Sequence, residues 1–98
     1  MPFGVKDSID VAGQVTTGCS RWHADDAPKP ADATCVARVR AAGAIPFGKQ
    51  TLYELNYGGP SFDLPFAPPR NPWNPARIPG GSSSGSASLS LDSETPSL

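Results

Sequence analysis

Apolar residues occur along this chain in short alternating stretches, which predict small structural elements. Phe3 and Val5 precede charged residues and predict a strand that ends at Lys6. Ile9 and Val11 give a second brief alternation within an irregular segment. No apolar run approaches the length that a membrane span requires. The N-terminal part of the chain is therefore expected to be extended, with a charged turn after its first strand.

The clearest helix is predicted over residues 31–42, with Asp32 as its N-cap and Gly43 directly after its C-terminal end. Three-to-four spacing assigns its apolar face to Cys35, Val36, Val39 and Ala42, with Ala33 as a further candidate. Residues 44–48 follow as a short buried strand, in which Pro46 favours a position at an edge or an end. A helix followed closely by a strand is typical of α/β proteins.

The remaining segments predict mostly irregular structure. Residues 21–30 are polar and end with two prolines, which indicates an exposed connection, and residues 51–57 predict a second short helix. Residues 60–79 hold seven prolines, so they form either an extended loop against the protein body or a flexible linker. From Ser88 onward the sequence predicts no defined structure.

Length and charge narrow the class of protein. A chain of 98 residues with 12 prolines and 10 glycines forms at most one small domain with a marginal core. Its net charge is −1, with acids and bases interspersed, which argues against a nucleic-acid or membrane partner because both favour a basic face. No signal-peptide pattern follows Met1, so a cytoplasmic location is expected. Trp22 and Trp73 are expected to be partly buried.

The two cysteines, Cys19 and Cys35, are expected to be free thiols because no secretion signal accompanies them. A zinc site is not expected, because His23 is the only histidine that could join them. His23 itself is expected to be a solvated loop residue.

Two motifs carry candidate chemistry. P-F-G-V-K-D spans residues 2–7, and on composition alone its lysine would be a surface residue in a charged turn. P-G-G-S-S-S-G-S-A spans residues 79–87, and by composition it would be a flexible linker. It lacks the G-x-x-x-x-G-K pattern of a phosphate-binding loop. It contains G-x-S-x-G, but a nucleophile elbow needs a histidine after it, and the only histidine lies upstream.

Together the two motifs resemble two of the three catalytic blocks of the amidase signature family, which hydrolyses carbon–nitrogen bonds of amides. The wider string G-V-K-D-S-I-D-V-A-G at residues 4–13 matches the first block. The segment R-N-P-W-N-P-A-R-I-P at residues 70–79 matches the approach to the second. Residues 32–45 and 48–55 also resemble family segments, as does the loop over residues 58–66, which favours a free-standing bacterial amidase. The resemblance runs from Pro2 to about Ala87.

The resemblance implies an α/β protein with a partial amidase-signature fold, in which helices flank a mixed sheet. It assigns Lys6 as the base and Ser82 as the bridging serine, after a cis peptide bond between Gly81 and Ser82, with Ser83 in a supporting position. A free lysine has a pKa of about 10.4, so a base near neutral pH needs its pKa lowered by roughly 3 units. The substrate class is a small-molecule amide, and no metal or organic cofactor is implied.

In the family the nucleophilic serine follows the bridging one by about two dozen residues, which places it beyond Leu98. We therefore expect an amidase fragment, with a partial amidase domain over residues 1–87, an unstructured tail over residues 88–98 and no activity alone. One alternative is a half-enzyme completed by a separate C-terminal piece, including an amidotransferase A-type subunit. Another is an interaction module, because P-F-A-P-P-R at residues 65–70 contains a P-x-x-P motif for an aromatic groove.

Overall fold

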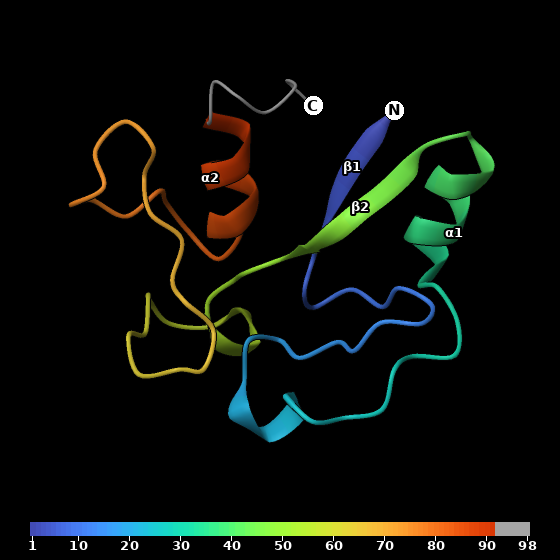
Figure 1. Ribbon diagram of the computed structural model, residues 1–98, viewed down its shortest axis with the longest axis horizontal. Coiled ribbons are helices and arrows are strands. Elements are labelled where there is room, and N and C mark those ends of the chain that lie inside the picture. Colours follow the sequence, from blue (N-terminus) through green and yellow to red (C-terminus); the bar gives the residue numbers. More distant parts are fainter. Residues whose placement is uncertain (92–98) are drawn as a thin grey trace.

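The computed structural model describes residues 1–91, and Figure 1 shows two strands side by side with a helix on either side of them. Two single-turn 3-10 helices lie in the connecting loops. In chain order the elements are β1 (Pro2–Lys6), η1 (Arg21–His23), α1 (Thr34–Ala41), β2 (Ile45–Gln50), η2 (Glu54–Asn56) and α2 (Ser84–Leu91). The molecule is thus a small α/β arrangement in which long loops join short elements.

Strands β1 and β2 form a parallel pair, and α1 lies in the connection between them, as parallel pairing requires a crossover. Val5 pairs with Lys49 and Lys6 with Gln50, after an irregularity between Phe3 and Gly4. The prediction that the first strand ends at Lys6 is confirmed. The second strand continues two residues beyond its predicted end, so both strands present lysines near their carboxyl ends.

The two helices cover opposite faces of this strand pair. Val36 of α1 belongs to the same buried cluster as Val5. Ser86 of α2 instead donates a hydrogen bond to the side chain of Gln50. Because side chains alternate along a strand, Val5 and the Lys6–Gln50 pair point to opposite faces.

Helix α1 is shorter than predicted, and its cap is different. It begins at Thr34, and Ala33 is the N-cap, without a side-chain hydrogen bond. The predicted cap, Asp32, accepts a hydrogen bond from the Ala12 N–H at 2.8 Å and pairs with Arg40 at 2.9 Å. A charged partner and a distant backbone donor therefore compete successfully for its carboxylate. Gly43 does follow the helix with a left-handed φ of +93°, as predicted.

The core is small. Its fully buried cluster consists of Val5, Val11 and Val36. The predicted apolar face is confirmed for Val36 and for Ala33, which packs against the valine cluster, and is wrong for Cys35, Val39 and Ala42, which are exposed. The predicted burial of the second strand is also wrong, since Ile45 is 65% and Phe47 50% exposed. Within residues 1–91, β2 pairs with β1 alone, and the exposure of Ile45 and Phe47 shows that little packs over their side of the strand.

The loops mostly follow the sequence-based expectations. Residues 60–79 contain no helix or strand, and His23 lies on the surface, 2.8 Å from Asp26. Residues 51–57 form only the turn η2, because Leu55 and Asn56 adopt left-handed φ values of 51° and 64° that an α-helix does not accept. The described helices include none long and apolar enough to cross a lipid bilayer.

Three further expectations for the loops and tail are wrong. Trp22 is 88% and Trp73 79% exposed, although partial burial was expected. Residues 88–91 belong to α2, although no structure was predicted from Ser88 onward. Residues 92–98, the rest of the predicted tail, lie outside the described residues, and the division at residue 87 stays a prediction.

Replacing Val36 by alanine is expected to lower the free energy of unfolding by about 2 kcal/mol, because it removes buried methyl groups from the small core. Val39 lies on the same helix but is 40% exposed, so Val39→Ala is the matched control, with an expected loss of about 0.5 kcal/mol. Urea unfolding followed by circular dichroism measures both variants. Equal losses would show that the valine cluster is not the core.

Candidate active site

The two motifs meet at the carboxyl end of β1. Lys6 is half-buried there, and its Nζ lies 3.1 Å from Ser82 Oγ, a contact that joins residues 76 positions apart. The same ammonium group also lies 3.1 Å from Ser83 Oγ. Both hydroxyls accept from the lysine. The structure therefore brings together the two residues that the sequence motifs single out, and their catalytic roles remain proposals.

The serine segment, residues 80–86, is held in place by two hydrogen bonds to the chain that follows β2. Gly85 N–H donates to the Thr51 carbonyl at 3.0 Å, and the Tyr53 hydroxyl donates to the Gly80 carbonyl. A Cβ atom on Gly85 would lie 2.5 Å from Thr51 O and 2.7 Å from Thr51 N, closer than real atoms approach. Glycine at this position therefore lets the helix approach the backbone beside Lys6 closely.

The expected cis peptide bond is absent. Residues 1–91 contain no cis peptide bond, so Gly81–Ser82 is trans. A cis bond before a non-proline residue costs about 3–4 kcal/mol and persists only where the surroundings enforce it. Gly81 is exposed and Ser82 is only half-buried, so their surroundings do not supply that constraint.

A second lysine, for which no motif in the sequence indicates a role, lies on the other face of the strand pair. Lys49 Nζ pairs with Asp7 Oδ1 at 3.0 Å, and the two side chains are only 13% and 10% exposed. Thr17 donates to the same carboxylate through its backbone N–H and its hydroxyl. The available signal was the position of a lysine near the end of each predicted strand, but the partner of Lys49 was not evident locally.

An open groove of about 350 Å³ runs beside Lys6, between α1 and the serine segment. Its walls are mainly apolar, with Lys6, Ser83 and Ser86 as polar members. The apolar and thiol-bearing members are Phe3, Val5, Ile9, Cys35, Val36 and Val39. The groove has room for a small molecule with an apolar part next to the lysine.

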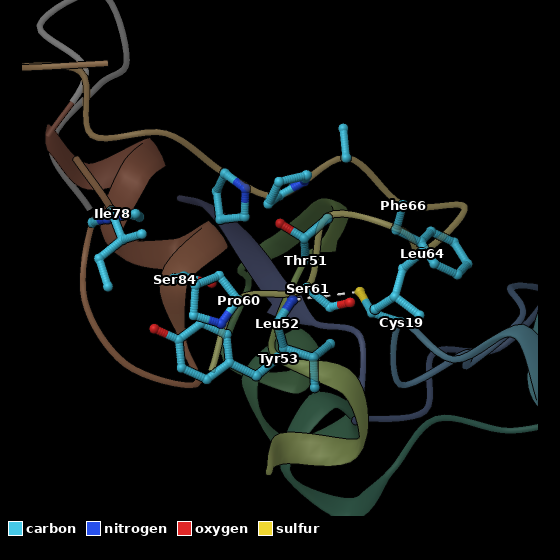
Figure 2. A pocket seen from close by; sticks show the side chains of 14 residues that line it. Cys19, Thr51, Leu52, Tyr53, Pro60, Ser61, Leu64, Phe66, Ile78 and Ser84 are labelled. Atoms are coloured by element: carbon cyan, nitrogen blue, oxygen red, sulfur yellow. Dashed lines mark hydrogen bonds between the residues drawn. The ribbon is translucent and has the colours of Figure 1, made fainter. Parts of the chain in front are cut away.

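A separate small cavity lies under the proline-rich loop (Figure 2). Its volume of about 20 Å³ suits nothing larger than a water molecule, so it is not a substrate pocket. Ser84 Oγ is buried on its wall and has no hydrogen-bond partner among the described residues. Cys19, also on the wall, is buried, and its Sγ accepts from the Leu52 N–H at 3.4 Å.

Burial raises the pKa of the Cys19 thiol above its ordinary value of 9.0. The Leu52 N–H opposes that effect, and the Asp7 carboxylate adds to it. Both cysteines are free thiols, as predicted, but Cys35 is exposed. Among residues 1–91 there is no group of three or more histidine, cysteine or acidic side chains that could hold a metal ion.

Comparison with known proteins identifies the family to which this chain belongs. The amidase family model matches residues 1–90, and the chain therefore belongs to the amidase family. Among curated relatives, the chain is 46% identical over 87 residues to the A subunit of the glutamyl-tRNA(Gln) amidotransferase of Exiguobacterium sp.. It is 43% identical over 96 residues to the corresponding protein of Roseiflexus sp.. These matches cover 89% and 98% of this chain. They give no support to the preference for a free-standing amidase.

Solved structures agree with the sequence relatives. The chain is similar to the A subunit of the glutamyl-tRNA(Gln) amidotransferase of Thermotoga maritima, with a TM-score of 0.81 and 39% identity over 91% of this chain. It also resembles a chain from a vestigial protein complex that reveals the evolutionary origins of an s-triazine catabolic enzyme, with a TM-score of 0.84 and 37% identity over 93% of this chain. These likenesses confirm the predicted α/β partial amidase-signature fold.

The chain spans about a fifth of the length of these relatives. It covers 18% and 20% of the two curated relatives and 20% of each solved chain.

Gly85→Ala is expected to destabilise the chain by about 1–3 kcal/mol, although alanine is the better helix former, because the new methyl group collides with Thr51. Gly59→Ala is the matched control, since a Cβ at Gly59 meets no atom within 4 Å. Urea unfolding gives the free energies, and hydrogen exchange of the Gly85 N–H reports whether its bond to Thr51 persists. Unchanged exchange in Gly85→Ala would contradict the close approach.

The raised pKa of Cys19 predicts that stability falls as pH rises above about 9. The unfolded chain releases the thiol proton first, so the stability contribution present below pH 9 is lost as pH rises toward the folded pKa. Cys19→Ala should lack this part of the decline, and unfolding in urea at pH 7.5 and 10 measures it. Cys35→Ser is the control and should keep the decline. An identical pH dependence for Cys19→Ala and the unsubstituted chain would refute the assignment.

Proposed function

We propose that this chain supplies the lysine and the bridging serine of an amidase site that hydrolyses carbon–nitrogen bonds of small amides. The observation that carries the proposal is the 3.1 Å contact between Lys6 Nζ and Ser82 Oγ, formed at the carboxyl end of a parallel strand. Functional groups in α/β proteins commonly lie at that end of the strands. Membership of the amidase family supports the same chemistry.

In the proposed mechanism Lys6 acts in its neutral form as a general base. It accepts the Ser82 hydroxyl proton while Ser82 accepts the proton of a nucleophilic serine, which attacks the amide carbonyl. The relay then runs backwards, and the proton passes to the leaving amine as the carbon–nitrogen bond breaks. Water releases the acyl group by the same relay. Ser83, whose hydroxyl also bonds Lys6 Nζ, would hold the lysine amine in line with Ser82.

The nucleophile and the donors that stabilise the tetrahedral oxyanion are assigned to a complementing C-terminal piece. Without the nucleophile no acyl intermediate forms, and without oxyanion donors the charge that develops on the carbonyl oxygen is not stabilised. The relatives' names, which describe one subunit of an amidotransferase, support assembly with other polypeptides. The mainly apolar groove beside Lys6 is the proposed position for part of the substrate.

A proline-rich docking motif is the weaker candidate. Phe66, Pro68 and Pro69 are half-buried and line the small cavity beneath their own loop. A polyproline II ligand has to present such side chains to a partner's aromatic groove. The packing of this loop on its own chain therefore competes with that function.

The chain alone is expected to show no amide hydrolysis, because two parts of the catalytic machinery are assigned elsewhere. Mixing it with the C-terminal part of the Exiguobacterium relative, from the residue that follows the matched region, is expected to yield turnover of a simple amide such as glutaminamide. Lys6→Ala and Ser82→Ala should each lower that rate at least about 100-fold. Ammonia release measures the activity.

Ser61→Ala is the matched serine control, because the Ser61 hydroxyl donates to Asp63 within its own loop and should not be needed for the full rate. Turnover by the chain alone, lost in Lys6→Ala and Ser82→Ala, would show that it carries its own nucleophile. Turnover by the mixture that survives both substitutions would refute the assigned roles.

A further inference from the structure

A base at Lys6 has an immediate electrostatic problem. The next residue is Asp7, and a carboxylate beside a lysine favours the charged ammonium, which cannot accept a proton. Asp7 is also 7% exposed, so water screens its charge poorly. If Lys6 is to act as a base, the charge of Asp7 has to be balanced within the protein.

Lys49 is placed to provide that balance. Its three ammonium protons match three acceptors, namely Asp7 Oδ1 at 3.0 Å, the Ile9 carbonyl at 2.7 Å and Thr16 Oγ1 at 3.1 Å. A surface lysine that only met a carboxylate by chance would keep its head group in water. The nearly buried and fully bonded head group of Lys49 indicates a fixed positive charge instead.

The orientation of Asp7 supports the same interpretation. Its carboxylate accepts from the Thr17 N–H and hydroxyl, so it is held toward Lys49 and the following loop. In the strand register Lys49 pairs with Val5 and Lys6 with Gln50, so the two lysines emerge on opposite faces. The carboxylate of Asp7 is thus bonded on the face away from the serine hydroxyls.

We infer that the Asp7–Lys49 ion pair is a charge-balancing unit that keeps Lys6 able to act as a base. The inference rests on the role proposed for Lys6, and it makes Asp7 and Lys49 positioning residues without contact to the substrate. Two charged side chains lie on the elements next to Lys6. Strand β2 contributes Lys49, and the loop after β1 contributes Asp7. Among residues 1–91, the serine segment and α2 present hydroxyls to Lys6, and α1 adds the Cys35 thiol in the shared groove.

The test follows the titration of Lys6 itself in the full chain. The chain has three lysines, Lys6, Lys29 and Lys49, so ¹³C-lysine labelling gives three assignable side-chain signals. Lys49→Met leaves the Asp7 charge unbalanced and should move the Lys6 titration midpoint up by about 1 pH unit. Asp7→Asn leaves the Lys49 charge unbalanced and should move it down by a similar amount. Lys29→Met is the control and should not move it, because the bonds of the pair join Asp7 and Lys49 to Ile9, Thr16 and Thr17 and not to Lys29.

The double variant Asp7→Asn/Lys49→Met separates charge balance from a merely structural role. Charge balance predicts that the Lys6 titration midpoint of the double variant returns to that of the unsubstituted chain. A structural role predicts instead that the midpoint of the double variant differs at least as much as that of either single variant. Lys49→Arg keeps the positive charge, so its Lys6 titration midpoint should equal that of the unsubstituted chain. Midpoints that stay fixed, or that move in one direction in both single variants, would overturn the inference. If Lys49→Met does not fold, the comparison of Asp7→Asn with the unsubstituted chain decides. A lowered Lys6 midpoint supports the inference, and an unchanged or raised midpoint overturns it.

This readout does not depend on turnover. Failure of the complemented hydrolysis assay with the predicted midpoint shifts intact would reject the proposed function and leave the charge balance standing. Restored hydrolysis without midpoint shifts would reject the charge balance alone.

Discussion

The parallel pairing of β1 with β2 is the constraint on which the rest of this structure depends. It sets Lys6 level with Gln50 and Val5 level with Lys49, so the carboxyl ends of both strands bring a lysine to the same end of the sheet. Strand alternation then sends the two ammonium groups to opposite faces. One meets the serine segment and the other a carboxylate. A shift of one residue in this register would exchange those faces and separate Lys6 from both hydroxyls.

The two faces differ in electrostatic character. On the serine face the ammonium of Lys6 has neutral hydroxyls as its partners. On the other face Lys49 and Asp7 form a nearly buried ion pair, and such pairs give little net stability because desolvation offsets their attraction. The presence of this pair beside so small a valine core is therefore easier to explain through its effect on neighbouring charges than through stability.

Local pattern was a good guide to the elements and a poor guide to what covers them. The alternation at Phe3 and Val5 predicted the first strand correctly, and Gly43 marked the end of α1. The apolar residues Ile45 and Phe47 predicted a buried strand, but burial depends on a neighbouring layer that local sequence does not specify. Asp32 failed as a cap because its preferred partner, Arg40, is defined by the folded structure.

The candidate site was likewise predictable from the sequence only in part. Lys6 and Ser82 were found through motifs that resemble a known family, and the structure brings their side chains into contact. The Asp7–Lys49 pair was missed because it depends on strand register and on the path of the loop after β1. The expected cis peptide bond at Gly81–Ser82 came from the resemblance alone, and the exposed glycine there adopts the ordinary trans form.

The separation of Lys6 and Ser82 along the chain has a kinetic consequence. Their contact closes a loop of 76 residues, and the entropy of closing such a loop has to be lost before the contact returns any free energy. Parallel pairing of β1 and β2 is also non-local, and topologies of this kind fold slowly. A ribosome therefore has to synthesise both motifs, 76 positions apart, before the contact between Lys6 and Ser82 can form.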